Sequence, residues 1–175
     1  MLKNVFFPFL FAGFVSSVAL ADDCKLELDG NDQMQFDKKE LKLPEACRSK
    51  EITLTLKHSG KLPKNVMGHN VVVYAEGPLG KDNQEPHFNA VVAGGIKAGL
   101  AANHVDQSQV GEGNGKFIVG FSPVIGGGDK PVTVTFKPKT FKADKTYGFV
   151  CTFPGHSAMM KGKLVFEKTE AKKAG

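Results

Sequence analysis

A short segment near the C-terminal end of the chain holds side chains that can ligate a soft metal ion. Cys151 is followed five residues later by His156, and the adjacent Met159 and Met160 close the same Pro-Gly-containing loop. Thiolate, imidazole and thioether groups together favour copper over harder cations. Two imidazoles and one thiolate in a plane, with a weak axial Met, is the arrangement of electron-transfer copper sites. The segment therefore predicts a copper site that needs a second histidine from elsewhere, with either methionine as the axial group.

The best candidate for the second histidine is His69. It leads into an expected strand, and it follows Gly68, whose missing side chain lets a backbone carbonyl approach a metal. The remaining histidines stand alone without partnered spacing, and we expect them to be ordinary surface or core residues. They are His58, His87 and His104.

Other chemistries compete for these residues. A cysteine hydrolase also pairs a Cys with a His, but no third group that orients the base is visible, and a Met has no role there. Zinc could bind Cys151 and two histidines, yet it gains little from a thioether. Residues 111–116 resemble a phosphate-binding loop superficially, but Phe117 stands where a Ser or Thr is required, so a glycine turn is favoured.

Strands and turns must position the candidate ligands. Apolar and polar residues alternate around Leu26, Leu54 and Val134, which is the pattern of half-buried strands. Short strands separated by Gly- and Pro-containing turns are typical of a sandwich or Greek-key barrel. We expect an all-β fold of about eight strands. Further strands are expected at residues 70–74, 116–121, 147–153 and 163–166.

Two stretches of the chain do not follow the strand pattern. Residues 77–115 include a segment rich in Ala, Val and Gly, which predicts a short helical flap. Residues 167–175 are rich in lysine, and we expect them to form a basic, solvated tail.

The first residues of the chain indicate export. Lys3 precedes an apolar run that ends in Ala19-Leu20-Ala21, and this order predicts a signal peptide at residues 1–21. The run is shorter than the roughly 20 residues of a membrane span. Of the 175 residues, 22–166 then form one domain, and its net charge, +5 for the whole chain, does not demand nucleic acid.

An exported domain with three cysteines leaves one thiol for other chemistry. Cys24 opens the first expected strand, and Cys47 lies just before another. A disulfide between them would close a loop of roughly two dozen residues and stabilise the domain by about 3 kcal/mol. Cys151 then remains for a metal.

Three blocks of the sequence resemble the azurins, a family of bacterial periplasmic cupredoxins. The blocks are residues 30–36 (GNDQMQF), residues 62–70 (LPKNVMGHN) and residues 151–162, which begin CTFPGHSA. The Cys-x4-His-x3-Met spacing of the third block is the azurin spacing, and it selects Met160 over Met159 as the axial group. The resemblance covers the chain except its middle and implies an eight-stranded Greek-key β-barrel.

The resemblance also implies roles for individual residues. Cys24 and Cys47 match the family disulfide, and His58 matches a buried histidine behind the copper site. The implied equatorial ligands are His69, Cys151 and His156, with Met160 and the Gly68 carbonyl on opposite axial sides. The backbone amides of Asn70 and Phe153 would tune the reduction potential through the sulfur. The expected partner-binding patch around His156 consists of Met34, Met67, Phe153, Pro154 and Met159.

The leading hypothesis is a periplasmic one-electron carrier, not an enzyme, that cycles one copper ion between Cu(I) and Cu(II). It would dock briefly with redox proteins such as c-type cytochromes or periplasmic reductases. We expect no nucleic-acid partner and no membrane span in the mature chain. The alternative is a copper chaperone or storage protein, which would hold Cu(I) in an open, exchangeable site.

Overall fold

The computed structural model describes residues 24–78 and 117–168. The predicted signal peptide at residues 1–21 lies outside the described residues. The same holds for His87, His104, residues 169–175 of the predicted tail and all but the first two residues of the predicted flap.

Strands are the main regular structure of the described residues, and the predicted all-β fold is confirmed. A single short α-helix and one 3-10 helix interrupt them. In chain order the elements are β1 (Lys25–Asn31), β2 (Gln35–Phe36), β3 (Glu40–Pro44), η1 (Glu45–Ser49), β4 (Ile52–His58), α1 (Lys64–Met67), β5 (Val72–Pro78), β6 (Ile118–Phe121), β7 (Val132–Phe136), β8 (Lys145–Val150) and β9 (Lys161–Glu167).

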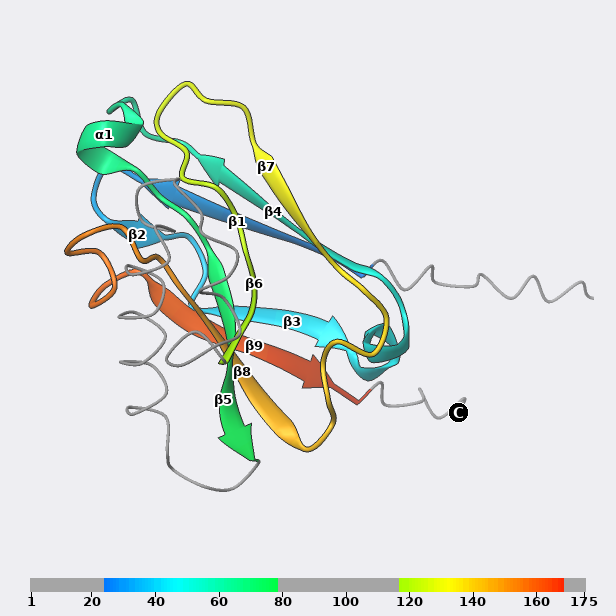
Figure 1. Ribbon diagram of the computed structural model, residues 1–175. Helices are drawn as coiled ribbons and strands as arrows, with labels where there is room; N and C mark the ends of the chain where they lie inside the picture. Colours follow the sequence, from blue (N-terminus) through cyan, green and yellow to red (C-terminus); the bar gives the residue numbers. More distant parts are fainter. Residues whose placement is uncertain (1–23, 79–116, 169–175) are drawn as a thin grey trace, which may run out of the picture.

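The strands form two sheets packed face to face (Figure 1). The first sheet has the order β2-β1-β4-β7, and the second has the order β3-β9-β8-β5-β6. Strands β1 and β4 pair in parallel, as do β3 and β9, while the other neighbours are antiparallel. The parallel pairs join segments far apart in the sequence, so the sandwich depends on long-range pairing.

Alternating apolar residues fill the space between the sheets. Leu28 on β1 and Leu54 and Leu56 on β4 are at most 1% exposed, and they share one apolar core with Val73 and Phe149 of the second sheet. Fully burying one such side chain stabilises a fold by about 1.5–3 kcal/mol. This core fixes the strands from whose ends the candidate ligands project.

The two ends of the sandwich carry different structural features. In Figure 1, α1, β2 and the loop between β8 and β9 lie together at the left-hand end, while η1 lies at the right-hand end. Cys47 on η1 forms the predicted disulfide with Cys24, which immediately precedes β1. The disulfide prediction is therefore confirmed, and the bridge lies at the end remote from the candidate ligands.

The observed strands differ from the expected ones in several places, and strand β2 was not expected. Strand β8 ends at Val150 rather than Phe153, because the chain leaves the sheet at Cys151 to form the loop that ends at Met160. Strand β3 was not expected, although Leu41 and Leu43 alternate with exposed residues there. No helix in residues 24–78 or 117–168 is long and apolar enough to cross a membrane.

Candidate metal site

Three buried side chains from two distant segments meet at the left-hand end of the sandwich. Possible ligand atoms of His69, Cys151 and His156 all lie within 4.8 Å of one another. The two histidine Nδ1 atoms are 3.2 Å apart, and Cys151 Sγ is 3.8 Å from His156 Nδ1. None of the three residues is more than 3% exposed. The structure thus brings together the three residues predicted as equatorial ligands.

His69 is held from both its backbone and its ring. Its backbone N–H and carbonyl exchange hydrogen bonds of 2.8 Å with Ile125. Its ring Nε2 lies 2.9 Å from the carbonyl oxygen of Asn31, which can only accept, so Nε2 carries the proton. The Nδ1 atom therefore keeps its lone pair and points toward Cys151 and His156.

Gly68 is needed for space as well as for its carbonyl. Its φ of −72° is ordinary for any residue. A Cβ atom at this position would lie 2.3 Å from the Lys64 carbonyl oxygen and 2.9 Å from Cε2 of Phe153. Only glycine therefore lets α1 and the Phe153 ring approach the chain just before His69.

The loop from Cys151 to Met160 folds back on itself. The Cys151 N–H donates to the Met160 carbonyl at 2.9 Å, and the Met160 N–H donates to the His156 carbonyl at 2.9 Å. As a result the Met160 side chain is 0% exposed, whereas that of Met159 is 54% exposed. Burial thus separates the two methionines in the way that the azurin spacing implies, with Met160 inside.

The Cys151 thiol lies in an apolar environment that disfavours its ionisation. Burial raises the pKa of the thiol to about 11, although backbone N–H groups of Asn70 and Phe153 hydrogen-bond the sulfur and lower it. These are the two amides expected to act on the sulfur. A cation bound at the sulfur would reverse the balance and hold it as a thiolate.

Both histidines are neutral at neutral pH. Burial lowers the pKa of His69 to about 4, against a hydrogen bond to the Asn31 backbone that raises it. Burial also lowers the pKa of His156. Neutral imidazole is the form that binds metal ions. Two nitrogen lone pairs and a sulfur atom therefore converge in a buried space, which is a site for a cation.

Similarity to known proteins identifies this cation. A family model described as "Copper binding proteins, plastocyanin/azurin family" matches residues 22–167. The chain belongs to this family.

Individual members of the plastocyanin/azurin family resemble the chain over most of its length. It is 38% identical to an azurin of Bordetella pertussis over 164 residues, which cover 94% of this chain and 97% of that protein. It is 40% identical to an azurin of Alcaligenes faecalis over 141 residues, 81% of this chain and 96% of the other. The solved azurin Az-iso2 of Methylomonas sp. strain J superposes with a TM-score of 0.65 at 30% identity, covering 83% of this chain and 98% of that one.

Copper suits the side chains that this member of the plastocyanin/azurin family presents. The predicted copper cofactor is confirmed by the family and by the His-Cys-His group. A buried thiol and a buried thioether beside two neutral imidazoles form a softer set than zinc requires.

A pair of side chains links the segments that carry His69 and Cys151. Asn70 Nδ2 donates to Thr152 Oγ1 at 2.9 Å, and the Thr152 N–H donates to Asn70 Oδ1 at 2.8 Å. Both residues are buried. Because these bonds are in a dry environment, they hold the two ligand-bearing segments in a fixed relative position.

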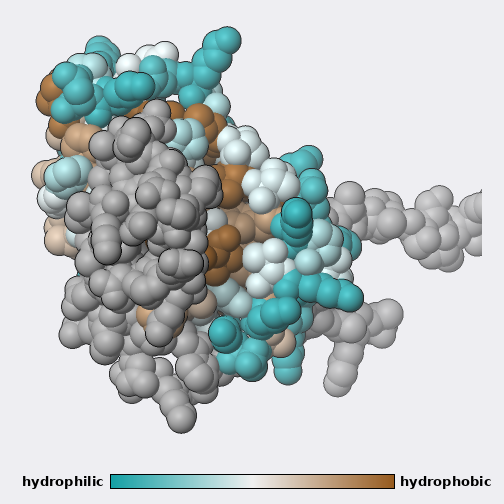
Figure 2. Space-filling view, viewed as in Figure 1, coloured by the Kyte–Doolittle hydropathy of each residue, from teal (hydrophilic) through white to brown (hydrophobic). Residues whose placement is uncertain are grey.

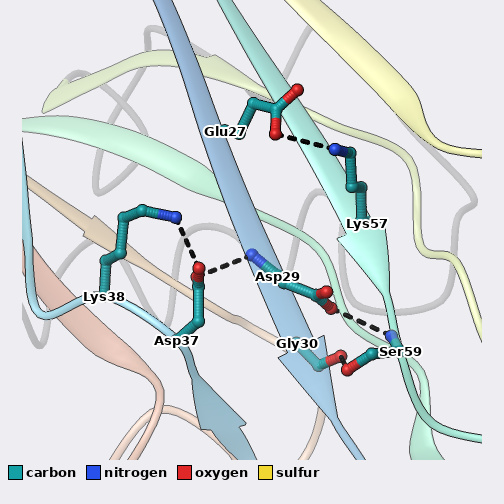
Figure 3. Close-up of polar contacts among 7 residues, drawn as sticks. All are labelled: Glu27, Asp29, Gly30, Asp37, Lys38, Lys57 and Ser59. Atoms are coloured by element: carbon teal, nitrogen blue, oxygen red, sulfur yellow. Dashed lines mark hydrogen bonds and ion pairs between the residues drawn. The ribbon is translucent and has the colours of Figure 1, made fainter.

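The end of β1 packs directly on two candidate ligands. A Cβ atom on Gly30 would lie 2.5 Å from Cδ2 of His69 and 3.3 Å from Cε of Met160. Figure 3 shows how this end is fixed: the Asp29 N–H donates to Asp37 Oδ1 at 2.8 Å, and the Ser59 N–H donates to Asp29 Oδ1 at 2.9 Å. Gly30 belongs to the first of the three azurin-like blocks, but nothing in the sequence indicates its contacts.

His58 lies beside the site, as the resemblance implies. Its ring stacks on that of His69, with centroids 4.5 Å apart and planes 10° from parallel. Its Nε2–H donates to the Met67 carbonyl at 2.9 Å, and the Gly60 N–H donates to its Nδ1 at 3.0 Å. His58 therefore restrains the His69 ring by packing against its face.

The residues expected to form the partner-binding patch differ in exposure. Pro154 is exposed, Met67 and Phe153 are half-buried, and Met34 and Met159 are 37% and 54% exposed. The Phe153 ring lies over that of His156, with centroids 4.8 Å apart.

Two exposed apolar residues near α1 were not expected in the patch. Leu62 and Val66 are 39% and 54% exposed. Leu62 immediately precedes Pro63 and Val66 lies on α1, so their position outside any strand was the available signal. We call these two residues and the five expected ones the apolar patch. Figure 2 shows brown apolar surface at the upper left, over the end that carries α1.

Proposed function

We propose that this protein is a one-electron carrier that cycles a single copper ion between Cu(I) and Cu(II) at a type 1 (blue) site. Its equatorial ligands would be His69, Cys151 and His156, with Met160 and the Gly68 carbonyl as axial groups. The observation that carries the proposal is the convergence of three buried donor atoms within 4.8 Å, backed by a fully buried Met160.

Rigid support of the ligands is what suits this chain to electron transfer. Copper, when bound, supplies a one-electron redox couple. The Asn31 carbonyl holds the His69 ring, the Asn70–Thr152 pair holds the two ligand segments together, and the Asn70 and Phe153 amides stabilise the sulfur as a thiolate. A ligand set that moves little between oxidation states keeps the reorganisation of the site small.

The burial of Cys151 supports a carrier over the other two hypotheses. A nucleophilic cysteine must meet its substrate, but this side chain is 0% exposed. A chaperone needs an open site, whereas His69 and Met160 are also 0% exposed. We therefore propose no catalysed reaction for this protein.

We further propose that the protein works in the periplasm, as a domain of residues 22–166 exported by residues 1–21, with residues 167–175 as a basic tail. Its partners would be redox proteins such as c-type cytochromes or periplasmic reductases, met at the apolar patch beside His156. Small, short-lived interfaces are usual between such proteins.

The visible spectrum of the protein loaded with Cu(II) tests this function. We expect an intense blue band from charge transfer between the Cys151 thiolate and copper, and its loss in Cys151→Ser. A colourless Cu(II) complex would overturn the carrier proposal. Tight binding of Cu(I) alone, with no stable Cu(II) form, would instead indicate a chaperone or storage protein.

A further inference from the structure

Lysines surround the apolar patch. The segments at this end of the molecule, residues 31–39, 59–68, 122–130 and 151–161, contain six lysines and three aspartates, with no glutamate or arginine. All six lysines are exposed. They are Lys38, Lys39, Lys61, Lys64, Lys130 and Lys161, and we call them the lysine rim.

Two of these lysines lie at the edge of the apolar patch. Lys39 Nζ donates to the carbonyl oxygen of Met159 at 2.7 Å. Lys64 begins α1, and both its carbonyl oxygen and the Phe153 ring would lie within 3 Å of a Cβ atom on Gly68. The Figure 2 view shows hydrophilic surface over the α1 end, directly beside the apolar surface.

The aspartates at this end are engaged by the protein itself. Asp32 accepts hydrogen bonds from the backbone N–H groups of Lys61 and Leu62, at 2.7 and 3.2 Å. Asp129 accepts from the Gly126 N–H at 3.0 Å, and Asp37 forms an ion pair with Lys38. Their carboxylates are therefore fixed against the loops.

Two lysines of the rim, Lys61 and Lys64, are free to meet a partner. Within the described residues, the side chains of Lys61 and Lys64 form no hydrogen bond or ion pair, since only the Lys61 backbone contacts Asp32. Long lysine side chains of this kind keep their charge in water beside apolar surface.

We propose that the lysine rim selects a redox protein whose docking face carries carboxylates around its own exposed cofactor. The inference rests on the proposed carrier function and adds the chemistry of the partner. Opposite charges speed the encounter, and the apolar patch supplies the brief contact. A second copy of this chain is a poor occupant, because lysines would then face lysines.

Two soluble c-type cytochromes serve as probes, one with carboxylates and one with lysines around its haem edge. Stopped-flow mixing with the copper-loaded protein gives a second-order rate constant for each. We expect faster transfer with the carboxylate-ringed cytochrome, by about tenfold or more at low ionic strength, and a loss of this preference at high ionic strength.

Matched charge reversals locate the effect. The double variant Lys61→Glu, Lys64→Glu changes the rim, and Lys137→Glu, Lys145→Glu makes the same change in net charge on exposed residues at the opposite end of β7 and β8. We expect the rim variant to lose the preference for the carboxylate-ringed cytochrome and the control to keep it within about twofold. A blue band in each double variant would confirm that it retains the copper site.

A second readout does not depend on electron transfer. Amide chemical shifts of the Cu(I) protein, titrated with the carboxylate-ringed cytochrome, should change around Lys39, Lys64 and Met159. Shift changes confined to the opposite end would overturn the proposal.

The remaining outcomes separate this inference from the proposed function. Rapid transfer to both cytochromes at equal rates, or equal effects of the two double variants, would leave the carrier function standing and overturn the role of the rim. Self-association through the patch at low ionic strength would also overturn it. Absence of a blue band and of transfer to either cytochrome would overturn both proposals.

Discussion

At the scale of single residues, the metal-free site carries no charge at neutral pH. The pKa of His69 is lowered to about 4, that of His156 is also lowered, and that of Cys151 is raised to about 11, all chiefly by burial. The histidines are therefore ready to bind a metal, whereas the thiol must first give up a proton. Uptake of the metal is thus coupled to proton release.

The first prediction concerns this proton. Adding Cu(II) to the metal-free protein at about pH 8 should release about one proton per copper, because the Cys151 thiol is protonated and the histidines are not. A pH indicator in weak buffer measures the release. Cys151→Ser is the control and should release much less. Release near zero from the unaltered protein would show that the thiolate is already present without metal.

The second prediction separates the two methionines. Met160→Gln should shift the reduction potential and the blue band, because Met160 is 0% exposed beside the His69 ring and Met159 is 54% exposed. The buried amide should also lower the free energy of unfolding by about 1–3 kcal/mol. Met159→Gln should change stability by less than about 0.5 kcal/mol. Voltammetry and denaturant unfolding provide the measurements, and equal shifts in potential would contradict the axial role of Met160.

Single residues could be predicted where chemistry marks them and not where only packing does. Cys151, His156 and Met160 share a loop with a spacing that indicates copper. Nothing local marks the contact of Gly30 with His69, or the Asn31 carbonyl that accepts from the His69 ring. Such contacts join residues about 40 positions apart, and they follow from the pairing of whole strands.

At the scale of elements, the end of β1 limits the space available to the His69 and Met160 side chains. A Cβ atom on Gly30 would meet both His69 and Met160, and hydrogen bonds among Asp29, Asp37 and Ser59 keep this end of β1 in place (Figure 3). The end of β1 can therefore move away from the site only if these hydrogen bonds also break. The positions of the two ligands thus depend on a strand that supplies neither of them.

The third prediction tests whether the end of β1 positions these two ligands. Gly30→Ala should move the His69 ring or the Met160 methyl group, so the blue band should shift and stability should fall by about 1–3 kcal/mol. Gly128→Ala is the control, because its Cβ would meet nothing within 4 Å and only its φ of +85° is strained. It should lose about 1 kcal/mol without a spectral change. Indistinguishable spectra for Gly30→Ala and the unaltered protein would contradict the positioning role of β1.

Long strands with alternating apolar and polar residues could be predicted from the sequence, and the shortest strand could not. Strands β1, β4 and β7 follow period-two patterns, and the structure has them where these patterns lie. Strand β2 has only two residues, too few for any pattern, and it forms because Gly30 and Asn31 pair with Phe36 and Gln35. The parallel pairing of β1 with β4 could not be predicted, since it depends on contacts between distant segments.

At the scale of the whole molecule, the sandwich separates stability from chemistry. The disulfide between Cys24 and Cys47 ties the start of β1 to η1 at one end, and the candidate ligands lie at the other (Figure 1). Arg48 strengthens the disulfide end, since its guanidinium lies 3.9 Å from the centre of the Phe166 ring and donates to the Lys142 carbonyl at 2.8 Å. The rigid core between the ends should keep changes at one from reaching the other.

The fourth prediction follows from this separation. Replacing Cys24 and Cys47 by alanine removes a crosslink between residues 23 positions apart, which should lower the free energy of unfolding by about 3 kcal/mol. The blue band and the reduction potential should stay unchanged, because no candidate ligand touches the bridge. Denaturant unfolding and voltammetry on the same preparation give both quantities. A shifted reduction potential would mean that a structural change at the disulfide end is transmitted along β1 to Gly30. The two ends of the sandwich would then be structurally coupled.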